Sequence, residues 1–122
     1  MVWTEFNQEV YIMYRIREES GVKVVAIENT LREESVNPLK EKLNSFLEDG
    51  KSRIVLDMLK ADYITSIGLS MIVTVNKKAQ MQGGGVKLAC ISRLMKNLLE
   101  STKLDRIISV YDTVDEAIES FR

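Results

Sequence analysis

The sequence predicts an α/β fold: a single domain with a mixed sheet of about five strands and about four helices. After a short N-terminal segment come two alternating runs separated by a tight-turn sequence, which is typical of an antiparallel hairpin. After the hairpin, amphipathic helical patterns alternate with short apolar runs, which is typical of a sheet with right-handed crossovers. The length of 122 residues and a composition of 45% hydrophobic and 29% charged residues suit one domain with its own core. We expect residues 1–122 to form this domain, with residues 1–8 as a loosely held arm because they show no periodic pattern.

The composition argues against several classes of function. The net charge of −1 gives no basic excess for nucleic acid binding, and no run approaches the roughly 18 apolar residues of a membrane span. The first residues lack a basic start and a long apolar segment, so we expect no signal peptide, no membrane insertion and a cytoplasmic location. The single cysteine, Cys90, cannot form an internal disulfide and is expected to be a small buried residue.

The predicted hairpin joins residues 11–17 to residues 22–28. The first run begins to alternate, and the second alternates throughout and is rich in valine and isoleucine. The turn falls at residues 19–21, whose sequence ESG ends in a glycine suited to a tight turn.

A first helix follows the hairpin. Asn37 and Pro38 fit an N-cap followed by proline at the first helical position, and Ser35 is a rival N-cap. One face of the helix is apolar, at Leu39, Leu43, Phe46 and Leu47. Gly50 is expected to end the helix, and the near-continuous apolar run at residues 54–58 is expected to form a central strand.

A second helix is expected at residues 66–82, just before the glycine run at residues 83–85. Its inward stripe consists of Leu69, Ile72, Val73 and Ala79. Met71 and Val75 lie partly off this stripe. Either neighbouring helices cover these two side chains, or they form an exposed apolar patch for a partner beside Ser66.

The glycine run leads into a fourth strand at residues 86–91. Phosphate-binding loops run from a strand to a helix, whereas this run follows a helix, so we interpret it as a simple turn. Strand side chains alternate, so Leu88 and Cys90 should share one covered face. Ala89 and Ile91 should lie on the opposite covered face.

Two more helices complete the predicted fold. Ser92 is expected to cap the third, whose core face consists of Leu94, Met95, Leu98 and Leu99. A short fifth strand is expected at residues 107–111. Thr113 and Glu116 form a capping box for the last helix, which should bury Ala117, Ile118 and Phe121.

The sequence offers no catalytic constellation. A serine nucleophile needs a base, usually histidine, and the chain has no histidine. Lysines could serve instead, but their spacing around Ser66 matches no Ser–Lys motif. The carboxylates are scattered, and Asp57 is best explained as a turn residue at the end of its strand. We therefore expect a protein that is not an enzyme and that binds no metal or cofactor.

The functional interest lies at Ser66. This serine lies in the segment TSIGLS, residues 65–70, where a strand leads into a helix. A helix begins there with free N–H groups and a partial positive charge. A serine at such a junction can cap the helix or carry a phosphate, and the residues alone leave both interpretations open.

Several short segments occur in a distinctive order. They are NTLR at residues 29–32 before the first helix, TSIGLS at 65–70, the glycines at 83–84, a segment with leucines at 99–108, and YDTVDEA at 111–117. In their order and spacing, over roughly residues 22–120, these segments resemble the STAS domain and within it the bacterial anti-sigma factor antagonists.

The resemblance implies a regulator of transcription that works by protein–protein interaction in bacterial signalling. It places the phosphoacceptor at Ser66. The implied partner is an anti-sigma factor with serine kinase activity, which binds the unphosphorylated antagonist and thereby frees the sigma factor. Phosphorylation releases the antagonist, and a PP2C-type phosphatase resets it.

The chain departs from the family pattern around the phosphoacceptor. Thr65 replaces an aspartate, Ile67 replaces a small residue, and Arg32 and Asn29 replace an aspartate and a glycine in the first loop. In the family both loops face the kinase, so the reversed charge at Arg32 should change the choice of partner. We expect Arg32 to lie within reach of Ser66, where it could neutralise part of a phosphoserine charge. The expected partner-binding residues are Arg32, Thr65, Ile67, Gly68, Met71 and Val75.

A second interpretation remains. The chain could be an unswitched STAS module of a signalling assembly or a membrane lipid-transport complex. In that case Ser66 would only cap its helix. A phosphate on Ser66 in the native cell would distinguish the two interpretations.

Overall fold

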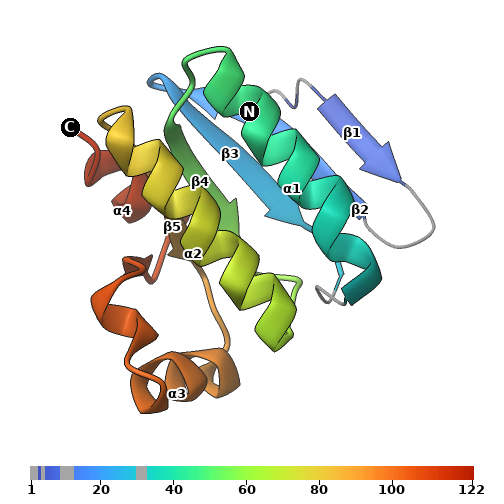
Figure 1. Ribbon diagram of the computed structural model, residues 1–122, viewed down its shortest axis with the longest axis vertical. Coiled ribbons are helices and arrows are strands. Elements are labelled where there is room, and N and C mark those ends of the chain that lie inside the picture. Colours follow the sequence, from blue (N-terminus) through green and yellow to red (C-terminus); the bar gives the residue numbers. More distant parts are fainter. Residues whose placement is uncertain (1–2, 4, 9–12, 30–32) are drawn as a thin grey trace.

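A mixed sheet runs through the computed structural model, which describes residues 3, 5–8, 13–29 and 33–122 (Figure 1). Its six strands lie in chain order: β1 (Glu5–Gln8), β2 (Met13–Glu19), β3 (Val22–Ile27), β4 (Arg53–Asp57), β5 (Gly85–Ala89) and β6 (Val110–Tyr111). The first three strands pair antiparallel, and β3 to β6 pair parallel. This arrangement confirms the predicted α/β fold with a hairpin followed by β/α units.

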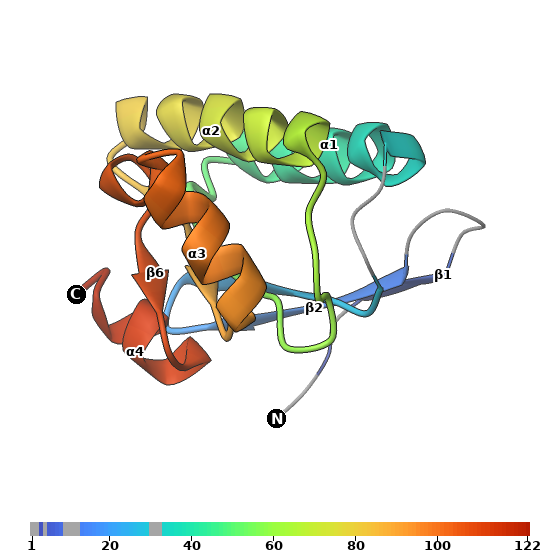
Figure 2. The same cartoon turned by 90° about the horizontal axis from the view of Figure 1, so that it is seen from below.

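Four α-helices cover the sheet. They are α1 (Glu33–Glu48), α2 (Ser66–Met81), α3 (Arg93–Ser101) and α4 (Val114–Glu119), and a short 3₁₀ helix spans Leu104–Arg106. The first two lie side by side over one face, and α4 lies on the other (Figure 2). None of the helices that the structure describes is long and apolar enough to cross a membrane.

The hairpin forms as predicted, and the sheet extends one strand beyond it. Ser20 and Gly21 both have positive φ, and Glu19 pairs with Val22, which is the geometry of a two-residue turn. Residues 5–8 are not part of a loosely held arm, as expected from the sequence, but pair with β2 as strand β1. Their sequence, EFNQ, lacks the alternation that marks a strand, and backbone pairing adds it to the edge of the sheet.

The predicted start of the first helix is wrong. In the structure α1 is already helical at Glu33, and Pro38 lies inside it rather than at its first position. The apolar face extends one turn earlier, to the buried Val36, and Glu33 and Glu34 suit the positive end of the helix. These contributions outweigh the one backbone hydrogen bond that proline cannot make. The other end is as predicted, since Gly50 follows the helix with φ +76°.

The core has two parts, one on each face of the sheet. The larger lies under α1, α2 and α3, and includes Ile54 and Leu56 of β4. The smaller lies under α4 and includes Val55 of the same strand, together with Ala117. Strand β4 is therefore covered on both faces, as its apolar sequence predicted.

The glycine run between α2 and β5 is a turn, as predicted. Gly83 has φ +87°, and the N–H of Gly84 donates to the carbonyl of Ala79 at 2.9 Å. A Cβ atom on Gly84 would lie 2.1 Å from the carbonyl oxygen of Ser52, so only glycine fits there.

The predicted pairing of side chains around Cys90 is wrong. Strand β5 ends at Ala89, and Cys90 has φ +61°, which breaks the alternation of a strand. Leu88 and Ile91 pack with the larger core, whereas Ala89 and Cys90 pack with the smaller one. Leu88 and Cys90 therefore lie on opposite faces, although Cys90 is half-buried rather than exposed.

The segment from α3 to α4 forms with local differences. Ser92 and Thr113 cap their helices as predicted, each hydroxyl oxygen accepting from the N–H three residues later. The prediction that Leu94 lies in the core is wrong, since this side chain is 60% exposed. In α3 the buried residues are Met95 and Leu99. The last strand covers only residues 110–111, and Ile107 is exposed beyond the short 3₁₀ turn.

Candidate functional site: the serine at the start of α2

The loop between β4 and α2 is folded back on itself by short-range hydrogen bonds. The N–H of Leu59 donates to the Asp57 carboxylate at 3.1 Å, and the N–H of Ala61 donates to the carbonyl of Met58 at 3.0 Å. Met58, Ala61 and Ile64 are buried and fix the loop to the core. Asp57 thus serves as the strand-end turn residue that the sequence suggested.

Helix α3 holds the last part of this loop. The hydroxyl of Ser92 donates to the carbonyl of Asp62 at 2.9 Å, while its oxygen accepts from the N–H of Met95 at 3.2 Å. The buried N–H of Ile64 donates to the sulfur of Met95 at 3.3 Å. Ser92, the N-cap of α3, and Met95 in its first turn therefore position the chain just before Ser66.

Thr65, and not Ser66, caps helix α2. Thr65 has extended backbone angles, φ −69° and ψ 164°, and its hydroxyl oxygen accepts from the N–H of Gly68 at 3.3 Å. Its carbonyl accepts from the N–H of Leu69 at 2.9 Å. The capping role considered for Ser66 is therefore wrong, because the chain enters the helix one residue earlier.

Ser66 occupies the first helical position and is exposed. Within the described residues, its hydroxyl has no hydrogen-bond partner. The first N–H groups of α2 and the absence of acidic residues from its first turn favour a negative charge at this point. The geometry thus presents a free hydroxyl at a place where a phosphate ester would be tolerated.

A mostly apolar groove lies beside Ser66, between α2 and α3. It has a volume of about 420 Å³ and is lined by Tyr63, Ser66, Leu69, Ser70, Val73, Leu98, Thr102 and Leu104. Tyr63, in the lining of this α2–α3 groove, is 40% exposed, and Ile67, adjacent to Ser66 in the sequence, is 46% exposed. Ile67 was predicted from the sequence as a partner contact, but Tyr63 and Leu98 were not. Helical periodicity assigned Leu98 to the core, and it cannot show that a side chain is only half covered.

The expected apolar patch at Met71 and Val75 does not exist. Met71 is 5% exposed and Val75 is fully buried, because α1 packs beside α2 and both side chains join the larger core. Gly68 is also buried, and Thr65 is half-buried with its hydroxyl used for capping. Met71 and Val75 are therefore scaffold residues. Arg32 lies outside the described residues, so its expected approach to Ser66 stays a prediction.

Charged and thiol groups near this end of the sheet are tied into the fold. Burial opposes ionisation of Glu28, but hydrogen bonds and charges from Arg15 and Lys60 outweigh it and hold the pKa of Glu28 below its usual value. Burial, with added repulsion from Asp57, raises the pKa of the Cys90 thiol. Cys90 therefore keeps its proton and is a poor nucleophile. Among the described residues, no three acidic or cysteine side chains could hold a metal ion together.

Comparisons with known proteins agree with this architecture. Residues 13–117 match the model of the STAS domain. Over 79 residues the chain is 34% identical to a candidate anti-sigma factor antagonist of Thermotoga maritima, covering 65% of this chain and 70% of that protein. A crystal structure of a candidate antagonist from the same organism has a TM-score of 0.83 at 28% identity, covering 89% of this chain and 94% of that one. The phosphorylated form of the Bacillus cell fate determinant SpoIIAA has a TM-score of 0.70, covering 89% of this chain and 99% of that one. At 16% identity this last likeness concerns the fold alone.

Proposed function

Because the chain belongs to the STAS domain family, we propose that it is an anti-sigma factor antagonist switched by phosphorylation of Ser66. The observation that carries the proposal is the division of roles at the start of α2. Thr65 caps the helix, so the exposed hydroxyl of Ser66 is left without a structural duty. The 34% identity to a candidate anti-sigma factor antagonist supports the choice of partner class.

In the proposed cycle, the unphosphorylated protein binds an anti-sigma factor with serine kinase activity in the cytoplasm, and sigma factor is released. The kinase transfers the terminal phosphoryl group of ATP to the Ser66 oxygen, ADP leaves, and the hydroxyl proton is released. A PP2C-type phosphatase later hydrolyses the ester. The chain is the substrate of both enzymes and contributes no catalytic residue itself.

The charge on the phosphate provides the switch. A phosphoserine carries about −1.5 to −2 charges at neutral pH, and the first turn of a helix stabilises such a charge by about 0.3–1 kcal/mol. Phosphorylation should therefore leave the domain folded. Partner binding is lost because the dianion must be desolvated beside Ile67, Tyr63 and the apolar α2–α3 groove.

The test is mass spectrometry of the protein purified from its own cells. We expect a phosphate on Ser66 that disappears in Ser66→Ala. The control is Ser70→Ala, an exposed serine one turn along the same helix, which should leave that phosphate in place. Absence of phosphate from Ser66 under all growth conditions, with subunits of a membrane transporter co-purifying, would favour the unswitched module.

A further inference from the structure

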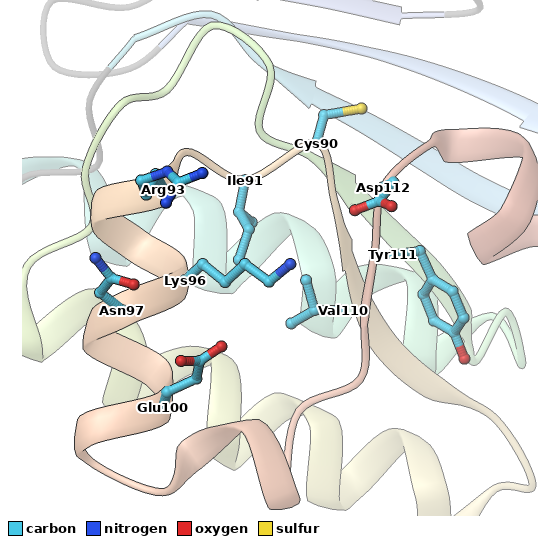
Figure 3. A pocket seen from close by; sticks show the side chains of 9 residues that line it. All are labelled: Cys90, Ile91, Arg93, Lys96, Asn97, Glu100, Val110, Tyr111 and Asp112. Carbon is cyan, nitrogen blue, oxygen red and sulfur yellow. The ribbon is translucent and has the colours of Figure 1, made fainter.

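A second hollow lies on another side of α3, away from the α2–α3 groove. It has a volume of about 450 Å³ and opens between α3 and the ends of β5 and β6 (Figure 3). No residue that lines it also lines the groove beside Ser66. Open α/β sheets bind ligands beyond the carboxyl ends of their parallel strands, and this volume lies in the range of small-molecule sites.

The walls of the hollow carry charges of both signs. Lys96 and Glu100 extend from α3 toward β6, Asp112 extends from the end of β6 toward α3, and Arg93 lies at the start of the helix (Figure 3). Within the described part of the chain, none of these four side chains forms an ion pair. Two cationic and two anionic side chains are therefore available to a ligand. Because their net charge is zero, the hollow favours neither a ligand with only negative charge nor one with only positive charge.

The charges are separated along the helix. Arg93 is in the first turn of α3 and Glu100 is seven positions later, a rise of about 10 Å. The helix dipole favours an acidic group near Arg93 and Lys96 and a basic group near Glu100. Between the two ends, Ile91 and Val110 pack against the larger core and give the hollow an apolar floor.

We propose that this hollow binds a small zwitterion with an apolar middle. Its acidic group pairs with Arg93 and Lys96, its ammonium group pairs with Glu100, and its apolar part rests on Ile91 and Val110. The proposal does not depend on the role of Ser66.

The test uses 6-aminohexanoate as the probe, with hexanoate and hexylamine as analogues that keep only one charge. Each is titrated into the isotope-labelled protein while the amide signals of residues 91–100 and 110–112 are followed by NMR. We expect saturable shifts confined to these residues, with the zwitterion binding several-fold more tightly than either analogue. Shifts that grow without saturation, or equal binding of hexanoate, would overturn the proposal.

Two variants separate the two charges of the ligand. Arg93→Gln should weaken binding of the zwitterion about two- to fivefold and leave the affinity for hexylamine unchanged. Glu100→Gln should weaken binding of the zwitterion by a similar factor and leave the affinity for hexanoate unchanged. Both positions are exposed, so the fold should survive, which the spectra themselves will show. The control Lys77→Gln removes an exposed charge from α2, outside the hollow, and should bind like the parent. Unchanged affinity in both α3 variants would also overturn the proposal.

Discussion

Asn76 joins helix α2 to the sheet and gives a sharp test of how that helix is held. Its side chain is only 3% exposed. The amide oxygen accepts from the N–H of Val86 at 2.8 Å, and the amide nitrogen donates to the carbonyl of Ile107 at 3.3 Å. The helix that carries Ser66 is thus fixed to β5 and to the segment before β6 by one side chain.

The substitution Asn76→Ala should cost about 2–3 kcal/mol of unfolding free energy. The buried N–H of Val86 would lose its partner, at about 1–3 kcal/mol, and the longer bond to Ile107 would add a smaller loss. The assay is urea unfolding followed by circular dichroism, in which the midpoint should fall while the denaturant dependence stays constant.

The matched control is Gln80→Ala, one turn further along the same helix. Gln80 is exposed, so this change should stay within about 0.5 kcal/mol of the parent. If Asn76→Ala is no more destabilising than Gln80→Ala, the buried amide bridge does not hold α2 to the sheet, and the reasoning fails.

Three further predictions concern the same end of the molecule. Thr65→Ala should lower the unfolding free energy by about 1 kcal/mol, whereas Ser66→Ala should change it by less than about 0.5 kcal/mol, because Thr65 is the cap; equal losses in urea unfolding would refute this assignment. The pKa of Glu28 is lowered in the fold, so its ionised carboxylate stabilises the folded state. This stabilisation is complete above the ordinary glutamate pKa of about 4.3 and is lost as the pH falls through the lower folded-state pKa. Glu28→Gln should therefore unfold with a weaker acid dependence, and an unchanged pH profile would contradict the prediction. Ser92→Asp keeps an oxygen that can cap α3 but cannot donate a hydrogen bond to the loop before Ser66. Amide hydrogen exchange in that loop should therefore accelerate about as much as in Ser92→Ala. Exchange as slow as in the parent would show that the donated bond is unimportant.

Much of the fold could be predicted because its signals are local. The hairpin turn at Ser20 and Gly21 and the caps at Ser92 and Thr113 depend on residues next to one another in the sequence. The position of Ser66 at the start of α2 was predicted from the same kind of local pattern. The suggestion that Ser66 caps the helix was wrong by one residue. Thr65 and Ser66 both carry a hydroxyl that could cap a helix, and only the backbone angles show that Thr65 is the cap.

The rest depends on contacts between distant segments. Met71 and Val75 are buried because α1 packs beside α2, which a single helical pattern cannot show. Asn76 interrupts the apolar stripe, and its partners are 10 and 31 positions away. The left-handed conformation of Cys90 belongs to a residue that normally avoids it, so the alternation predicted for the strand gave the wrong face.

The central claim is that a charge on Ser66 releases the partner without unfolding the domain. The most direct measurement is calorimetric titration of a candidate anti-sigma factor kinase into the parent protein, Ser66→Ala and Ser66→Asp, with the thermal unfolding of each recorded alongside. We predict that Ser66→Ala binds like the parent and that Ser66→Asp binds at least about tenfold more weakly, a loss of about 1.4 kcal/mol, with nearly unchanged thermal stability. Binding of Ser66→Asp as tight as that of the parent, or its unfolding, would contradict the claim.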